Sequence, residues 1–223
     1  MRKVIAATFV SVDGVMQAPG GPAEDPTGGF KYGGWTAPYF DEVVGQAIGG
    51  VFAGAPFDLL LGRKTYEIFA AHWPYYEDQP DGEIAKPFNA CRKYVATSSK
   101  APLTWNNSVA IHDPAADVAK LKKENGPALL IQGSSVLIHT LLKHNLIDEI
   151  HLLIFPLILG KGKRLFGEDG PGTELKLVSS KASPSGVQLN TYTPSGPVKT
   201  GDFSTKAPSE AELARREKMK KEG

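Results

Sequence analysis

The order of secondary-structure signals along the chain is the feature that most restricts its fold. Short apolar runs alternate with segments of helical spacing as far as about residue 155, and after that point strand follows strand. Alternation of this kind predicts parallel strands joined by helices, and the consecutive strands at the end predict an antiparallel edge. We therefore expect an α/β fold with a mainly parallel sheet, helices on both faces and an antiparallel C-terminal edge.

The predicted elements follow from apolar runs and from apolar residues spaced three or four apart. The predicted strands are residues 4–10, 57–61, 94–97, 128–132, 150–155, 175–180 and 186–193. The predicted helices are residues 38–48, 63–72, 83–91, 113–125 and a segment that begins after residues 133–135. Residues 1–195 are expected to form one domain, and residues 196–223 a charged tail that is flexible or helical.

Composition excludes several classes of protein. The net charge is +1, so no strong field attracts nucleic acid or a membrane surface. The single cysteine, Cys91, forbids a disulfide within the chain and fits a reducing compartment. The apolar run after Met1 is short and is followed closely by Asp13, which favours a buried strand over a signal peptide. The five histidines show no metal-ligand spacing, so we expect no metal. The single cysteine and the interpretation of the N-terminal run as a strand favour a cytoplasmic location.

Three strand-to-helix junctions carry the functional signal. At the first, Gly62 ends a strand and Arg63, Lys64 and Thr65 begin a helix. Cations at a helix N-terminus oppose the helix dipole, so their presence indicates a bound anion. The alternative is an ordinary solvated first turn. The spacing of a Walker phosphate loop is absent.

The other two junctions are weaker taken alone. Ser98 and Ser99, with Lys100, follow a predicted strand and offer hydroxyls and an ammonium to a phosphate, although surface loops often have this composition. Residues 131–137 join a strand to a helix through Gly133, Ser134 and Ser135, a turn that admits a pyrophosphate. Simple helix capping by either serine is an alternative. No G-x-G-x-x-G is present.

These motifs resemble the dihydrofolate-reductase superfamily, which includes the reductase domain of bacterial riboflavin biosynthesis, the RibD C-terminal domain. Residues 4–14 (VIAATFVSVDG) resemble the family's first strand and its S-x-D-G start. Residues 60–67 (LLGRKTYE) resemble its G-R-K-T-[WY]-E signature, and residues 131–134 occupy the place of its Gly-Gly turn, with Ser134 as the second residue. Residues 146–166 resemble the ending D-E-[LI]…P…G-x-G…L-F. The similarity covers residues 2–193.

The resemblance implies NADPH as the cofactor and a small heteroaromatic substrate. The implied cofactor-binding residues are Phe9, Met16, Gln17, Gly62, Arg63, Lys64, Thr65, Ser98, Ser99, Gln132, Gly133, Ser134, Ser135, Val136 and Leu137. The resemblance also implies a homodimer.

The proton donor and the substrate contacts are less defined. The nearest carboxylates to the family's helical acid are Asp41 and Glu42, at an imperfect offset, and Asp13 is a weaker candidate. Trp35, Phe69 and Trp73 are candidates to contact a flat ligand, while core packing explains most of the aromatic residues.

Two functional hypotheses follow. The first is an NADPH-dependent reductase that transfers hydride to a pterin-like, pyrimidine-like or other conjugated substrate. The alternative is a non-catalytic nucleotide-binding or regulatory module that retains the cofactor cleft. A phosphotransferase is disfavoured, because no Mg²⁺-ligating acid accompanies residues 62–65.

Overall fold

The computed structural model describes residues 1–53, 55–80, 82–167 and 170–222. Its strands are β1 (Val4–Ser11), β2 (Phe57–Gly62), β3 (Lys93–Ala96), β4 (Ser108–Ile111), β5 (Ala128–Gln132), β6 (Glu149–Phe155), β7 (Glu174–Ala182) and β8 (Gln188–Gly196). Its α-helices are α1 (Glu42–Ala53), α2 (Arg63–Ala70), α3 (Gly82–Ala90), α4 (Pro114–Lys123), α5 (Ser135–Lys143) and α6 (Glu210–Glu222). Short 3₁₀ helices cover Thr27–Gly29, Ala37–Tyr39 and Trp73–Tyr75.

The strands form one sheet in the order β4-β3-β2-β5-β1-β6-β8-β7. The pairs from β4 through β6 are parallel, and the pairs β6–β8 and β7–β8 are antiparallel. The predicted α/β fold, mainly parallel with an antiparallel C-terminal edge, is therefore confirmed. Because the parallel strands all end at one edge of the sheet, the turns after β2, β3 and β5 lie at that edge together.

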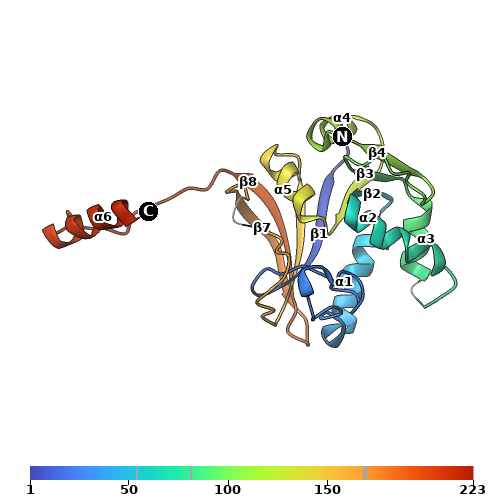
Figure 1. The fold of residues 1–223 in the computed structure, drawn as a ribbon, viewed down its shortest axis with the longest axis horizontal. Helices are drawn as coiled ribbons and strands as arrows, with labels where there is room; N and C mark the ends of the chain where they lie inside the picture. Colours follow the sequence, from blue (N-terminus) through green and yellow to red (C-terminus); the bar gives the residue numbers. More distant parts are fainter. Residues whose placement is uncertain (54, 81, 168–169, 223) are drawn as a thin grey trace.

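Helices cover both faces, as predicted (Figure 1). Side chains alternate along β1, so Ala6 and Val10 face one side and Ala7 and Phe9 face the other. The first face packs with α4 and α5 around a buried cluster that includes Leu129, Ile131 and Leu141. The second face packs with α2 and α3 at one end and with α1 at the other. The central strand β1 is thus shared by two layers of core.

One strand is missing from the prediction. β4 pairs with β3 at the edge of the sheet over four residues, and its central Val109 and Ala110 are exposed. Its apolar run is only Val109, Ala110 and Ile111, of which Ile111 alone is buried, so the segment is too short for hydrophobic periodicity to reveal it.

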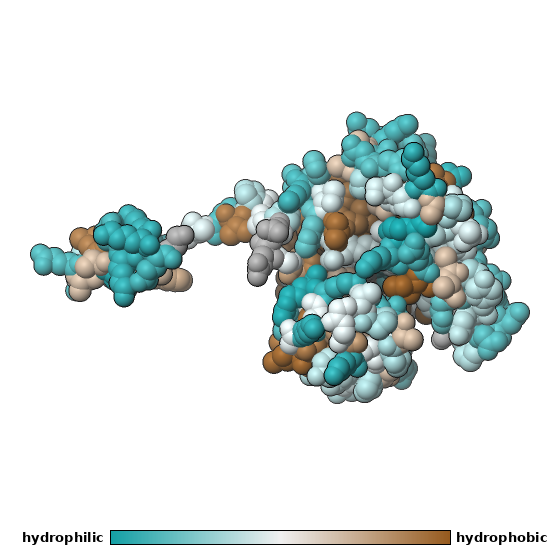
Figure 2. Space-filling view, in the orientation of Figure 1, coloured by the Kyte–Doolittle hydropathy of each residue, from teal (hydrophilic) through white to brown (hydrophobic). Residues whose placement is uncertain are grey.

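The C-terminal segment after β8 extends away from the sheet and ends in α6 (Figure 1). The helix has no buried residue, and its ion pairs lie within it, such as Arg215 and Arg216 with Glu212. Figure 2 shows a mainly hydrophilic surface over this helix. Among the described residues, no helix is both long and apolar enough to cross a membrane.

Candidate active site

The turns after β2 and β5 are joined by side-chain hydrogen bonds. The Gly62 N–H donates to the hydroxyl of Ser134 over 2.9 Å, and the hydroxyls of Thr65 and Ser134 are 2.7 Å apart. These contacts link residues about 70 positions apart in the sequence. The first and third predicted junctions therefore form one continuous surface at the carboxyl edge of the sheet.

The backbone of this surface requires small residues. Gly133 has φ +71° and Ser134 has φ +64°, both in the left-handed region. A Cβ added to Gly62 would lie 3.1 Å from the Ser134 hydroxyl oxygen, so the Ser134 side chain would have to shift to make room for it. The Ser134 side chain makes no capping bond to α5. The capping interpretation is therefore wrong for Ser134, whose hydroxyl instead joins the two turns.

Positive side chains lie beside this surface. Arg63 is held by Glu67, with 2.6 Å between Nε and Oε1, and its Nη1 donates to the carbonyl of Ala101 over 3.1 Å. That contact brings the start of α2 against the loop after β3, which contains Ser98, Ser99 and Lys100. Lys64 and all three loop residues are exposed. The second predicted junction is thus adjacent to the first.

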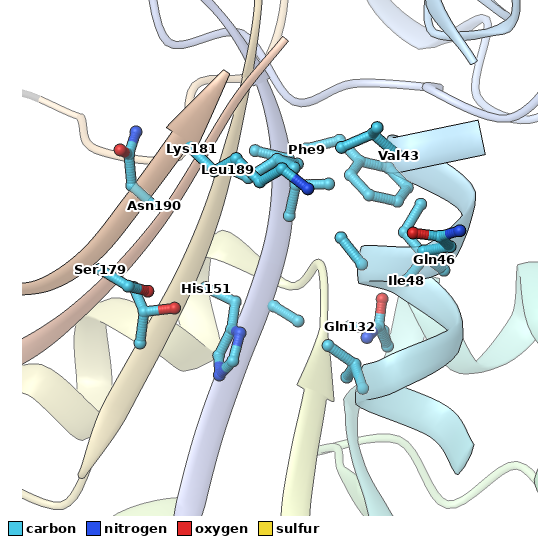
Figure 3. Close-up of a pocket in the computed structure, with 15 residues that line it drawn as sticks. Phe9, Val43, Gln46, Ile48, Gln132, His151, Ser179, Lys181, Leu189 and Asn190 are labelled. Atoms are coloured by element: carbon cyan, nitrogen blue, oxygen red, sulfur yellow. The ribbon is translucent and has the colours of Figure 1, made fainter. Parts of the chain in front are cut away.

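A cavity of about 330 Å³ lies between α1 and the face of the sheet formed by β5, β1, β6, β8 and β7 (Figure 3). Its residues come from α1 on one side and from five neighbouring strands on the other. They are Ala7, Phe9, Val43, Gln46, Ala47, Ile48, Val51, Gln132, His151, Leu153, Ser179, Lys181, Leu189, Asn190 and Thr191.

Strand register divides the floor of the cavity into two rows. Gln132, Ala7, His151, Thr191 and Ser179 are successive partners across the five strands. Two residues further along β1, the second row is Phe9, Leu153, Leu189 and Lys181. The first row is polar apart from Ala7, and the second is apolar apart from Lys181. The cavity therefore suits a flat apolar body with polar atoms along one edge.

The ionisable groups of the cavity are His151 and Lys181, within the described part of the chain. His151 is paired with Glu149, with 2.6 Å between Nε2 and Oε1. Figure 3 shows His151 and Gln132 on opposite sides of β1. No carboxylate lines the described cavity, so its charge is neutral to positive.

The predicted cofactor-binding residues divide into two groups. Phe9 and Gln132 line the cavity, and the Met16 Cε lies 3.7 Å from the position of a Cβ at Gly133. The second group does not line the cavity. The buried Gln17 side chain bonds to backbone atoms of Asp25, Thr27 and Lys163. Along α5, Ser135 is half-buried at the first position, Val136 is exposed, and Leu137 is buried in the core on the other face of the sheet.

The three aromatic residues expected at the substrate lie outside the cavity lining. Trp35 is buried, packs edge-on against Phe155 and donates from Nε1 to the Gln17 carbonyl. Phe69 and Trp73 pack against Phe88 between α2 and α3. Trp35 is buried in the core, and Phe69 and Trp73 are partly buried against it, which accounts for the positions of these rings.

The predicted proton donors have other partners. Asp41 accepts from the backbone N–H of Val44 and of Ser185, each over 2.9 Å. The bond from Val44 is the main cause that lowers the pKa of Asp41 to about 2, so the carboxylate stays ionised. Glu42 is exposed and accepts from Gln46. Neither lines the cavity. This geometry assigns Asp41 to joining α1 to the β7–β8 hairpin.

Asp13 also joins two segments of the chain through hydrogen bonds. It accepts from the Ser11 hydroxyl over 2.6 Å and from the backbone N–H groups of Leu159 and Gly160. Burial raises the pKa of Asp13, but these hydrogen bonds together lower it below its usual value. Asp13 therefore holds the loop after β6 against the end of β1.

Sequence reasoning missed His151, Lys181 and the residues of α1 and β8 in the cavity. A signal for His151 was present: Glu149 and His151 alternate with apolar residues along β6, which places both on one face of the strand. The contribution of α1 and β8 depends on which face each packs, and no local pattern reveals that.

Comparison with known proteins establishes the family. The sequence pattern of the RibD C-terminal domain matches residues 2–189. The chain belongs to the RibD C-terminal domain family. It is 28% identical over 197 residues to the uncharacterized protein YyaP of Bacillus subtilis (strain 168), covering 86% of this chain and 94% of that protein.

Solved structures share the fold at low identity. A pyrimidine reductase-like protein from Corynebacterium diphtheriae superposes with a TM-score of 0.57 at 14% identity, over 86% of this chain and 92% of that one. Dihydrofolate reductase from Enterococcus faecalis, complexed with NADP(H) and RAB-propyl, gives 0.54 at 16% identity, over 86% and 96%. The dihydrofolate-reductase-like fold expected for this RibD C-terminal domain is thereby confirmed.

Proposed function

We propose that this protein is an NADPH-dependent reductase that transfers hydride to a small conjugated heteroaromatic substrate. The observation that carries the proposal is the position of Gln132. It lines the cavity, and it directly precedes the Gly133–Ser134 turn that is bonded to Gly62 and Thr65. A dinucleotide along the turns and a ring in the cavity would therefore meet at Gln132. Membership of a reductase family supports this arrangement.

The turns suit the phosphates of a dinucleotide. Gly133 leaves the backbone open to close approach, and α2 and α5 begin directly after these turns, so their N-terminal N–H groups and dipoles favour an anion. Arg63, Lys64 and Lys100 add positive charge, and Ser98 and Ser99 add hydroxyl donors at the adjacent loop. This excess of charge and donors fits the additional 2′-phosphate of NADPH.

The cavity suits the substrate. When bound, the cofactor supplies the hydride, and the protein positions the two reactants. Phe9, Leu153 and Leu189 would contact the face of a flat ring, while Gln132 and Thr191 would bond to its edge. The helix α1 closes the opposite side through Val43, Ala47 and Ile48 and limits the access of water.

Fluorescence titration with NADPH and NADH tests the cofactor. We expect NADPH to bind more tightly by about 1–3 kcal/mol, the contribution of charge-assisted hydrogen bonds to the extra phosphate. Equal affinities would contradict this assignment.

Loss of NADPH absorbance with a panel of pterins and pyrimidines then tests the activity. Tight NADPH binding without turnover on any substrate would instead favour the alternative, a nucleotide-binding module without catalysis.

A further inference from the structure

The pair formed by His151 and Glu149 is the cluster of titratable groups that extends into the cavity. Both side chains project from the same face of β6, and Nε2 of His151 lies 2.6 Å from Oε1 of Glu149. The carboxylate favours a proton on Nε2. The other ring nitrogen, Nδ1, has no hydrogen-bond partner in the described part of the chain, and the His151 side chain is 26% exposed.

The space in front of His151 has a defined width. Gln132 and His151 flank Ala7 across β5, β1 and β6. Neighbouring strands are about 4.8 Å apart, so the backbones of Gln132 and His151 are about 10 Å apart, with Ala7 between them. The small Ala7 leaves the gap between their side chains open. A ring system of one or two rings that lies over Ala7 can reach Gln132 with one edge and His151 with the other.

The charges around this gap favour a hydrogen-bond acceptor on the ligand. Glu149 faces His151 from β6, and Lys3, before β1, lies 3.8 Å from Glu149. Lys181 of β7 lines the same cavity, and α1, β5 and β8 present the uncharged Gln46, Gln132 and Thr191. A cationic ring would meet no carboxylate among the lining residues. A neutral or anionic ring with a carbonyl oxygen or an unprotonated ring nitrogen can accept from His151.

We propose that His151 contacts the substrate and donates the proton that accompanies hydride transfer, with Glu149 as its positioning residue. The inference rests on the proposed reductase function. For a C=N bond, the carbon accepts hydride from the reduced nicotinamide, which is thereby oxidised. The π-electron pair of the bond moves to nitrogen, which takes the proton from Nδ1 of the imidazolium. His151 is left neutral and regains a proton from solvent.

Binding of lumazine, a neutral dioxopteridine, tests the contact without NADPH. Proton–nitrogen NMR should show the His151 ring signals shift on addition of lumazine, while those of the exposed His144 stay fixed. His151→Phe should weaken binding about 10-fold or more, and the control His144→Asn should leave it unchanged. Unmoved His151 signals, or wild-type affinity in His151→Phe, would overturn the proposal.

A second variant separates binding from proton transfer. His151→Asn retains a donor close to the Nδ1 position but has no proton to release, so its affinity for lumazine should stay within about threefold of the wild type. Its single-turnover rate of NADPH oxidation with 7,8-dihydropterin, which contains a C=N bond, should fall by about 10²–10⁴-fold. A wild-type rate in this variant would refute proton donation by His151.

The role of Glu149 has its own readout. Glu149→Gln replaces the carboxylate that lies 2.6 Å from Nε2 of His151 with a neutral amide. The ring-nitrogen NMR signals of His151 should therefore move and the single-turnover rate should fall, with the affinity for NADPH unchanged. Unmoved His151 signals together with a wild-type rate would contradict the positioning role. Failure of the reductase function is distinguishable, because it appears as wild-type protein that does not bind NADPH while lumazine still moves the His151 signals.

Discussion

The buried ammonium of Lys93 provides a direct test of the energetics of this fold. Lys93 lies on β3 and is fully buried. Its Nζ donates to the Asn89 carbonyl over 2.7 Å and to the Asn106 side chain over 3.4 Å, and it lies 4.4 Å from the centroid of the Trp105 ring. These partners are uncharged. Burial therefore lowers the pKa of Lys93 from 10.5 to about 8.

This shift sets the direction of a pH effect on stability. Between pH 8 and 10.5 the unfolded chain holds the proton that the folded chain has lost, so the free energy of unfolding rises with pH. One pKa unit corresponds to about 1.4 kcal/mol, so the full effect is about 3 kcal/mol, of which about 1 kcal/mol develops between pH 7 and 9. Burial also raises the pKa of Cys91 to about 11 from its ordinary 9.0, and that opposing effect sets in near pH 9. It is common to the wild type and to a Lys93 variant, so it cancels in the difference between them.

Urea unfolding of the wild type and of Lys93→Met at pH 7, 8 and 9 measures this contribution. Methionine fills a similar volume without a charge. The difference between the two proteins should move by about 1 kcal/mol in favour of the wild type as the pH rises from 7 to 9. Lys206→Met, at an exposed position of the tail, is the matched control and should show no such change. A Lys93→Met protein with the same pH dependence as the wild type would refute the reasoning.

Three further perturbations test other parts of the structure. Gly133→Val should leave a folded protein, because a Cβ there meets only ordinary contacts near Met16 and Thr65, and the φ of +71° costs about 1–2 kcal/mol. It should abolish NADPH binding, because the valine side chain would stand at the turn proposed to hold the phosphates. Circular dichroism with NADPH titration checks both results, and wild-type affinity would contradict the cofactor placement. Asp41→Asn should lower the melting temperature and spare NADPH affinity. In the wild type the contribution of Asp41, whose pKa is about 2, should be lost as the pH falls from about 4 towards 2; loss of NADPH affinity would show that Asp41 belongs to the site. Deletion of residues 206–223 should leave the melting temperature nearly unchanged, since α6 has no buried residue; a drop of many degrees would show that the tail docks.

The sequence by itself determined the class of the fold and the turns at the carboxyl edge of the sheet. Both depend on local chemistry: apolar periodicity defines strands and helices, and glycine with small polar residues defines a turn such as Gly133–Ser134. The bond between Ser134 and the Gly62 backbone was not predicted, although both turns were. Their parallel strands alone brought them to one edge.

The tertiary structure alone decided what each polar and aromatic side chain contacts. Asp41 meets Ser185 across 144 positions of sequence. Trp35 is buried although its loop position suggested exposure, and Phe69 and Trp73 are partly buried against Phe88. His151 reaches the cavity because the register of β5, β1 and β6 places it and Gln132 on either side of Ala7. Register and helix placement result from the packing of the whole core, so a local sequence pattern carries too little information to specify them.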